Sequence, residues 1–378
     1  MKKNIYMDNA ADTVISRPAL DKLNEILTSG ARNSSSLHLN GRIAAGYLEE
    51  ARDIVAASIG ASAHEVIFTS GGTEADNIAL IGYAFANRNR GNHIISTNVE
   101  HPAVLKSLKY LEECGFEVTY LKVNENCLID SFELESAIKK DTILVSIMYV
   151  NNETGAINDI RKLSDIAHSH GVAFMSDCVQ AYTKIDMDVN DLGIDLMSAS
   201  SHKFHGPNGA GFLYVRNGIK MTSFIHGGNQ ERKLRSGTVP VALVRSMAEA
   251  VIDAESHKED RSRIKKERDL LFEAVKSANG AVTVNGSMEN RIYDNICLSF
   301  PDIAADSFLY ALDDAGLSAS AGSACEAGSL QISHVIKAIG HEDIGAPLRL
   351  TLSRYTTHDE IIKAAEIINK VYSEHKKK

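Results

Sequence analysis

The sequence has no tryptophan, few cysteines and no long apolar stretch. Its 378 residues include five cysteines, an odd number without a Cys-x-x-Cys pair, which argues against both a disulfide framework and a zinc knuckle. No apolar run approaches the roughly 20 residues that a membrane-spanning helix needs. The start, MKKNIYMDNAAD, has two lysines but no apolar stretch behind them, unlike a secretory signal. These absences favour a reducing compartment, and we expect the cytoplasm.

Positive charge is also in short supply. The chain has 40 lysines and arginines against 49 aspartates and glutamates, a net charge of −9. This balance argues against a broad nucleic-acid or acidic-membrane surface, although a local pocket can still bind a small anion. The two histidines of HSH at 168–170 have no further ligand at hand, so we expect no metal site.

Short β-branched runs alternate with helical patterns over the first two thirds of the chain. This alternation is typical of βαβ units and predicts a mostly parallel sheet. The run at 209–216 follows a turn that is too short for a crossover, so it should pair antiparallel with its predecessor. The other strand-like runs lie at 65–70, 93–97, 117–121, 142–150, 172–177 and 195–200.

The last third has a different pattern. A long, charged, helical stretch at about 240–277 is best interpreted as a solvated helix that joins two domains. Strand-like runs follow at 295–300 and 348–353. Thr357 and Glu360 form a capping box, which predicts a final amphipathic helix. The apolar positions of that helix are Ile361, Ala364, Ala365 and Ile368. We therefore expect a smaller α+β domain after the large one.

Unusual polar residues follow the predicted strands at their carboxyl ends. In an open parallel sheet these ends border the crevice where ligands bind, so we expect the residues to share one site. They are Gly71 to Glu74, His101, Asn151, Asn152, Asp177, Gln180, Ser200, His202 and Lys203.

The segment Gly71–Ala75 opens a helix directly after a strand. Its free backbone N–H groups suit a phosphate, although a simple glycine-rich turn explains the same residues. No Lys-Ser/Thr pair follows at the P-loop spacing, so it is not a nucleotide P-loop.

Asp177 and Lys203 suggest what such a phosphate belongs to. A carboxylate at the end of an apolar strand needs a cationic partner, and a protonated ring nitrogen is one. Lys203 is either an ordinary surface charge at a hairpin or an amine that reacts with a carbonyl. A phosphate cradle, an acid for a pyridinium and a Schiff-base lysine together describe pyridoxal phosphate (PLP). His101 then fits as a flat group over the ring or a proton carrier, or simply starts a helix.

The sequence resembles the NifS/IscS-type cysteine desulfurases, PLP enzymes of the class V aminotransferase group. The resemblance extends over nearly the whole chain, in order, through YMDNAAD, FTSGGTEADN, VEHPAV, VNNETG, DCVQ, SSHKFHGPNGAGFLYV, GGNQERKLRSGT, AGSACEAGS and LRLTLSRYTT. It implies PLP fold type I: an α/β large domain with a mostly parallel seven-stranded sheet flanked by helices, plus a smaller α+β domain. The expected large domain comprises residues 16–255, and the small domain comprises 1–15 and 256–378.

The resemblance also implies a role for each polar group. Lys203 would hold PLP covalently, Asp177 would pair with the ring nitrogen, Gln180 would bond the ring oxygen and His101 would stack on the ring. Asn152 and Arg349 would hold the substrate carboxylate. The phosphate would be bound by Gly72, Thr73, Ser200 and His202, with Thr238 reaching the phosphate of the neighbouring subunit in a homodimer.

The catalytic thiol can be chosen without the family. Cys178 adjoins Asp177 on a strand and faces the other way, Cys297 lies mid-strand, Cys114 ends a helix and Cys127 lies in a polar turn. Only Cys325 lies in a long loop of small residues, 318–329, which can carry a thiolate to a substrate. The implied reaction converts L-cysteine to L-alanine and leaves a persulfide on Cys325. An acceptor protein of iron–sulfur cluster assembly or tRNA thiolation would then take the sulfur.

Several residues depart from the usual pattern of the family. Glu326 follows the nucleophile and should raise the pKa of the thiol. Asp12, Asn208, Asn229 and Ser353 also differ from the common residues, but none of them replaces a proposed catalytic group. Two alternatives stay open: another class V enzyme, such as a selenocysteine lyase or an aminotransferase, and a non-catalytic PLP-binding protein. The sequence does not identify the sulfur acceptor.

Overall fold

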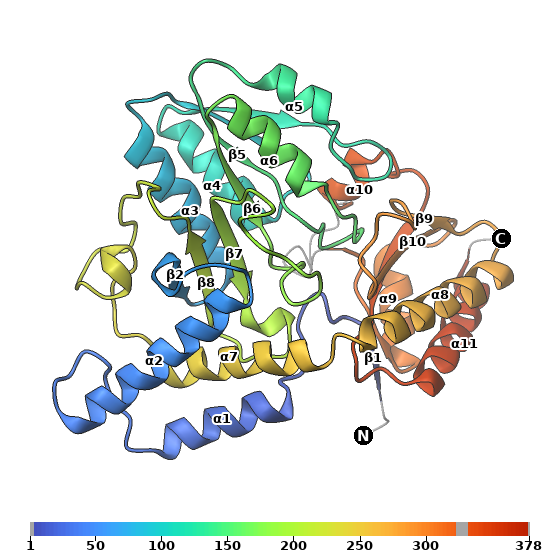
Figure 1. Ribbon diagram of the computed structural model, residues 1–378. Coiled ribbons are helices and arrows are strands. Elements are labelled where there is room, and N and C mark those ends of the chain that lie inside the picture. Colours follow the sequence, from blue (N-terminus) through green and yellow to red (C-terminus); the bar gives the residue numbers. More distant parts are fainter. Residues whose placement is uncertain (1–3, 323–331, 377–378) are drawn as a thin grey trace.

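A computed structural model describes residues 4–322 and 332–376 of the chain (Figure 1). Within this part, a seven-stranded sheet has the order β2-β8-β7-β6-β5-β3-β4. Its inner parallel strands follow the βαβ pattern, and β8 pairs antiparallel with both β7 and β2. The bounds are β2 Val66–Thr69, β3 His93–Thr97, β4 Glu117–Leu121, β5 Thr142–Ser146, β6 Ala173–Asp177, β7 Leu196–Ser200 and β8 Gly211–Val215. The predicted mixed α/β architecture with a mostly parallel seven-stranded sheet is confirmed.

Strand β5 is shorter than the predicted run at 142–150. The strand ends at Ser146, although Ile147 N and Tyr149 N still donate to the Met175 and Asp177 carbonyls of β6, at 3.1 and 2.9 Å. Met148 N donates instead to a side chain, Glu100 Oε1, at 3.0 Å. The apolar residues after Ser146 remain buried, so burial alone did not reveal where the strand ends.

Helices cover both faces of this sheet. Successive strand residues alternate between the two cores, as Ile94 and Ile95 of β3 do. One core includes residues of α3 (Gly72–Asn87) and α4 (Pro102–Glu113). The other includes residues of α2 (Leu39–Ala57), α6 (Ile160–Ser169) and α7 (Val241–Ser256); α1 (Arg17–Thr28) packs against α7, and α5 is Ser131–Ala137. Burial on both faces explains why these strands are almost wholly apolar.

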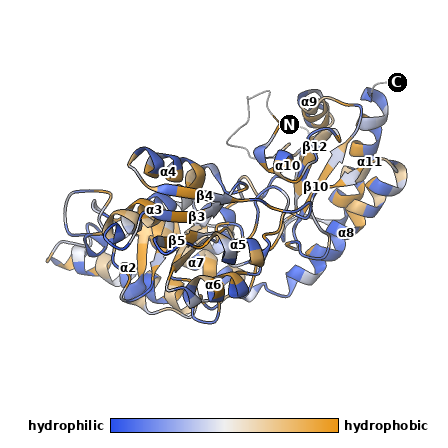
Figure 2. Ribbon diagram, turned by 90° about the horizontal axis from the view of Figure 1, so that it is seen from above, coloured by the Kyte–Doolittle hydropathy of each residue, from blue (hydrophilic) through white to orange (hydrophobic). Residues whose placement is uncertain are grey.

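Apart from the cores on the two faces of the large sheet, a separate core, called the second core below, lies beside that sheet (Figures 1 and 2). It covers a three-stranded antiparallel sheet, β12-β10-β9, and a short parallel pair, β1-β11. The elements are β1 Ile5–Tyr6, β9 Thr283–Val284, β10 Asn295–Phe300, β11 Leu317–Ser318, β12 Ala346–Thr351, α8 Asp260–Ala278, α9 Ala305–Asp314, α10 His334–Ala338 and α11 His358–His375. Ile5 and Met7 from the start of the chain belong to this core. The domain limits at residues 16 and 256 stay a prediction.

The predicted joining helix at 240–277 is in fact two helices. Helix α7 ends at Ser256 and packs on the large-sheet side, whereas α8 begins at Asp260 and lies against α11 (Figure 1). The intervening HKE segment has no apolar residue to continue a buried face, and His257 Nδ1 contacts the Asp253 carbonyl at 2.7 Å. Nor is α8 only a solvated link, since Ile264, Leu271 and Val275 are buried in the second core.

The final helix matches its prediction. Thr357 and Glu360 cap α11 reciprocally, and Ile361, Ala364, Ala365 and Ile368 are buried. In the part of the chain that the structure describes, no helix is long and apolar enough to cross a membrane.

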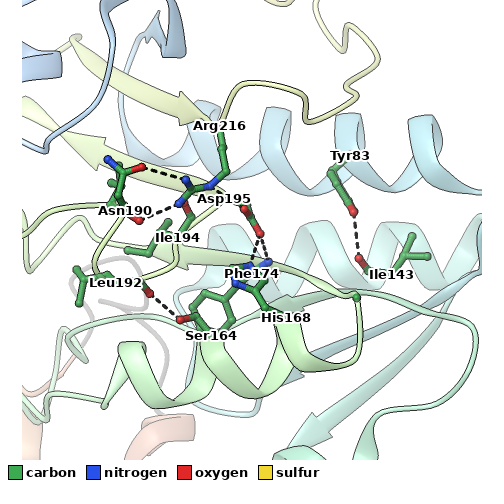
Figure 3. A network of polar contacts seen from close by, with 12 residues as sticks. Tyr83, Ile143, Ser164, His168, Phe174, Asn190, Leu192, Ile194, Asp195 and Arg216 are labelled. Atoms are coloured by element: carbon green, nitrogen blue, oxygen red, sulfur yellow. Dashed lines mark hydrogen bonds and ion pairs between the residues drawn. The ribbon is translucent and has the colours of Figure 1, made fainter.

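A polar network fixes the amino end of the large sheet (Figure 3). Asp195, directly before β7, accepts from Phe174 N and Arg216 Nε, each at 2.9 Å, and pairs with His168 Nε2 at 2.8 Å. The bond to Asp195 raises the pKa of His168. His168 therefore has a structural ion-pair role.

A buried ion pair holds a left-handed turn at residues 231–233 beside strand β2. Arg52 binds Glu231 through two bonds of 2.9 Å, and Glu231 also accepts from Phe68 N at 2.8 Å. Glu231, Arg232 and Lys233 have φ values of 39°, 57° and 64°, a left-handed run that costs energy for residues with a Cβ. The ion pair holds the first residue of this run against β2.

We predict that Arg52→Met lowers the free energy of unfolding by about 3 kcal/mol, because it leaves the Glu231 carboxylate buried without a cation. Urea unfolding measures this change. Arg17→Met is the matched control, since the Arg17–Asp21 pair lies in water and should leave the urea midpoint in place. Equal midpoints for the two variants would contradict the anchoring role of Arg52.

Candidate active site

A cavity of about 190 Å³ lies at the carboxyl ends of β6 and β7. It is opposite the end of these strands that the Asp195 network fixes, as the strand-end rule predicts. Ten of the twelve predicted site residues line it: Gly72, Thr73, His101, Asn152, Asp177, Gln180, Ser200, His202, Lys203 and Arg349.

Lys203 ends a single 3-10 turn, Ser201–Lys203, that follows β7 directly. The chain then turns back into β8 within a few residues, and the Ser201 and Gly206 amides close this turn on Ala210 O and Ser201 O. The short connection carries Lys203 into the cavity. Its Nζ donates to the carbonyls of Ala10 and Ala11, at 2.7 and 2.6 Å.

Asp177 is the last residue of β6 and is only 5 % exposed. Its Oδ1 accepts from Val179 N at 2.9 Å. Burial raises the pKa of Asp177, while the positive charge of His101, the Val179 bond and the charge of Lys203 act in the opposite direction. A cation in the cavity therefore stabilises the ionised form of Asp177.

A second carboxyl group, Asp76 of α3, lines the same cavity and was not predicted. It is 1 % exposed, and its Oδ1 has no hydrogen-bond partner among the described residues. Burial and the charge of Asp177 raise its pKa well above the usual range. The sequence held one signal, because Asp76 follows Gly72 by one helical turn and so shares its face.

The start of α3 forms the floor for an anion. A Cβ at Gly72 would lie 2.6 Å from Val179 Cγ2, so only glycine fits there. The first N–H groups of this 16-residue helix have no intrahelical partners, which suits a phosphate. Thr73, Ser200 and His202 add side-chain donors beside them.

His202 contacts one of the residues that depart from the family pattern. Its Nδ1 lies 3.1 Å from Asp12 Oδ1, and Asn208 Nδ2 bonds Asp12 Oδ2 at 3.4 Å. Burial and the neighbouring Lys203 lower the pKa of His202, whereas Asp12 opposes that shift. Asp12 thus links His202 to Asn208 beside the predicted phosphate site.

Arg349 enters the cavity from β12 and is 1 % exposed. It donates to Asn152 O at 2.9 Å and pairs with Asp8 Oδ1 at 2.8 Å. Asp8 also accepts from Ser320 Oγ at 2.7 Å. Asp8, a residue of the YMDNAAD motif that was given no role, therefore orients the guanidinium.

His101 is the N-cap of α4, and its Nδ1 accepts from Ala103 N at 3.1 Å. His101 therefore starts a helix and also lines the cavity, while its role over the ring or in proton transfer stays a prediction.

The sequence from residue 5 to 363 matches the family model described as aminotransferase class-V. The chain belongs to this family. It is 41 % identical to a cysteine desulfurase IscS of Dictyoglomus turgidum over 375 residues, which is 98 % of this chain and 95 % of the relative. It is 40 % identical to a cysteine desulfurase IscS of Methanosarcina thermophila, with 98 % and 92 % covered.

Solved structures of the same kind agree. A protein described as NifS-like superposes with a TM-score of 0.92 at 31 % identity, over 98 % of this chain and 99 % of that one. A structure described as SspA in complex with cysteine superposes with a TM-score of 0.82 at 32 % identity, over 93 % and 99 %.

The cofactor of this class-V aminotransferase family member is PLP, and the cavity fits it. The start of α3 at Gly72 offers N–H donors for a phosphate, and the buried carboxylate of Asp177 can pair with a cation. The amine of Lys203 lines the same cavity. These three groups match three parts of PLP: its phosphate, its protonated ring nitrogen and its aldehyde.

Two predicted residues are not brought into this cavity by the described part of the chain. Thr238 is exposed in the loop before α7 and does not line it. Cys325 lies outside the described residues, as does Glu326.

The four described cysteines are free. Burial raises the pKa of Cys127 to about 12 and that of Cys297 to about 11, and it raises the pKa of Cys178 further. These three thiols stay protonated at neutral pH. Cys114 is half-buried at the end of α4.

Glu100 provides a pH test beside the cavity. It is fully buried, and burial raises its pKa to about 8, although bonds from Met148 N and Thr97 Oγ1 oppose the shift. Below its ordinary pKa of 4.5 the carboxyl is protonated in the folded and unfolded chain alike. As pH rises towards 8, the unfolded chain loses this proton first, so the stability that Glu100 contributes is lost.

We therefore expect Glu100→Gln to gain stability over the wild type as pH rises from about 5 to about 8. The difference in unfolding free energy should grow by up to about 1.4 kcal/mol per pH unit. Urea unfolding at a series of pH values measures it, with exposed Glu125→Gln as the control. A difference that stays constant with pH would contradict the raised pKa.

Proposed function

We propose that this chain is a PLP-dependent cysteine desulfurase, which removes sulfur from L-cysteine and releases L-alanine. The observation that carries the proposal is the single cavity that holds Lys203, Asp177, His101 and Arg349. The likeness to IscS desulfurases over 98 % of the chain supports this activity, as does the cysteine-bound SspA neighbour.

When bound, PLP withdraws electrons from the substrate carbon that carries the amino group. Lys203 would hold the cofactor covalently and move protons at that carbon. Asp177 would pair as the carboxylate with the ring nitrogen, which would keep the ring electron-poor. Gln180 would donate to the ring oxygen, and His101 would stack on the ring and assist proton transfer.

Gly72 and Thr73 at the start of α3 would bind the phosphate, together with Ser200 and His202. Thr238 would reach the phosphate of the neighbouring subunit in a homodimer, which agrees with its exposure outside its own cavity. The shared site makes the dimer the active form.

Arg349 and Asn152 bind the substrate carboxylate. A guanidinium binds a planar carboxylate through two hydrogen bonds. The bond from Arg349 Nη2 to Asp8 Oδ1, at 2.8 Å, orients the guanidinium. The incoming carboxylate therefore meets an arginine that is already oriented.

The Cys325 thiolate attacks the sulfur of the bound cysteine. The carbon–sulfur bond breaks, the electron pair stays on the carbon and a proton then completes alanine. The sulfur remains on Cys325 as a persulfide, which passes to an acceptor protein of iron–sulfur cluster assembly or tRNA thiolation. Glu326 follows Cys325 in the sequence, and because a neighbouring carboxylate disfavours a thiolate, we expect it to slow this step.

A thiol chemistry of this kind needs a reducing compartment, and we place the enzyme in the cytoplasm. The four described cysteines, all free, agree with this placement.

The test combines the visible spectrum of the PLP-loaded protein with assays of alanine and sulfide after addition of L-cysteine. We expect a spectral change with both products, and we expect Cys325→Ala to lose on the order of 10³ or more in alanine formation while it still binds PLP. Cys114→Ala is the control and should retain activity. Sulfur release by Cys325→Ala at the wild-type rate would overturn the persulfide step, and a protein that never binds PLP would overturn the role of Lys203.

A further inference from the structure

Gln180 has two neighbours that fix the direction of its amide. Lys184 Nζ donates to Gln180 Oε1 at 3.2 Å, and Gln180 Nε2 donates to Ala10 O at 2.9 Å. An amide turned the other way would place its NH₂ against an ammonium and its oxygen against a carbonyl. Both contacts would then be repulsive, so only one orientation is allowed.

Lys184 is itself held by Asp294, the residue before strand β10 of the three-stranded sheet. It is 8 % exposed, and its Nζ pairs with Asp294 Oδ2 at 2.9 Å. Asp294 directly precedes β10, and its carbonyl accepts from Leu352 N at 2.8 Å. A buried ammonium between a carboxylate and an amide oxygen has little freedom to move.

This arrangement determines what Gln180 presents to the cavity. One hydrogen of Nε2 is bound to Ala10 O, and the second is available to an acceptor in the cavity that Gln180 lines. The positive charge of Lys184 on Oε1 also polarises the amide and strengthens Nε2 as a donor. Lys184 follows Gln180 by four positions in a series of turns, and it does not line that cavity itself.

We propose that Lys184, held by Asp294, is a positioning residue for the reaction: it locks the amide of Gln180 so that an N–H always faces the ring oxygen of the cofactor. The proposal rests on the proposed function only in that PLP occupies this cavity. The Lys184–Asp294 ion pair, which does not touch the cofactor, thereby influences the chemistry in the cavity.

The test is a pH titration of the visible absorbance of the bound cofactor. A donor on the ring oxygen stabilises its negative charge, and this weakens the hold of that oxygen on the proton at the Lys203 nitrogen. Loss of the donor should therefore raise the titration midpoint. We expect Lys184→Met to raise it by about one pH unit, a tenfold change in proton affinity, and Gln180→Ala to do the same.

The double variant Lys184→Met/Gln180→Ala decides whether Lys184 acts through Gln180. It should titrate like Gln180→Ala alone, because no amide is left to orient. The other titratable and charged groups that line the cavities around the two lysines are the same in these three variants. They are Asp76, His101, Asp177, His202, His205, His257, Asp260, Tyr293 and Asp294, with Arg261, Arg349 and Arg354. The control is Lys276→Met, which removes a lysine of α8 that donates to the Gly280 carbonyl. It should titrate like the wild type.

A midpoint in Lys184→Met equal to the wild type would overturn the proposal, as would shifts that simply add in the double variant. If Lys184→Met does not fold, Lys184→Met/Asp294→Asn removes both buried charges and is titrated in its place. A wild-type protein that binds PLP but yields no alanine overturns the desulfurase assignment, while the titration still decides the role of Lys184. A wild-type protein that never binds PLP overturns both.

Discussion

Asp177 is a carboxylate at the end of a fully buried strand, and water does not compensate its charge. An isolated buried charge of this kind costs several kcal/mol, so the surrounding residues have to supply positive charge and hydrogen bonds. Val179 N, His101 and Lys203 supply part of both. The requirement for a further cation over Asp177 defines the chemistry of the cavity more than any other single contact.

Much of this arrangement could be predicted because it is local in the sequence. A β-branched run followed by a polar residue gives a strand with its functional group at the carboxyl end, and His101, Asp177 and Lys203 were found in that way. The break between α7 and α8 was missed, since charged residues continue a helical pattern while they give it no face to bury.

Contacts between distant residues could not be predicted from patterns. Asp8 and Arg349 are 341 positions apart, and Lys184 and Asp294 are also far apart in the sequence. Each of these residues alone resembles an ordinary surface charge, and only the fold brings it to a partner. Asp76 was missed for another reason: in the sequence it is one of several polar residues in the first turns of α3, and its burial beside Asp177 depends on how α3 docks on β7.

The N-terminal segment crosses between the two cores and takes part in both. Ile5 and Met7 pack in the smaller core, Asp8 holds Arg349, and the carbonyl of Ala10 accepts from Gln180 and Lys203. The ribosome makes this segment before the large sheet, yet one of its partners is Arg349 of strand β12, 341 positions after Asp8. The large sheet is complete in sequence by Val215, so it can form while the chain is still growing. Ala10 can therefore meet Gln180 and Lys203 as soon as the large sheet has formed, whereas Asp8 finds Arg349 only after β12 has been made.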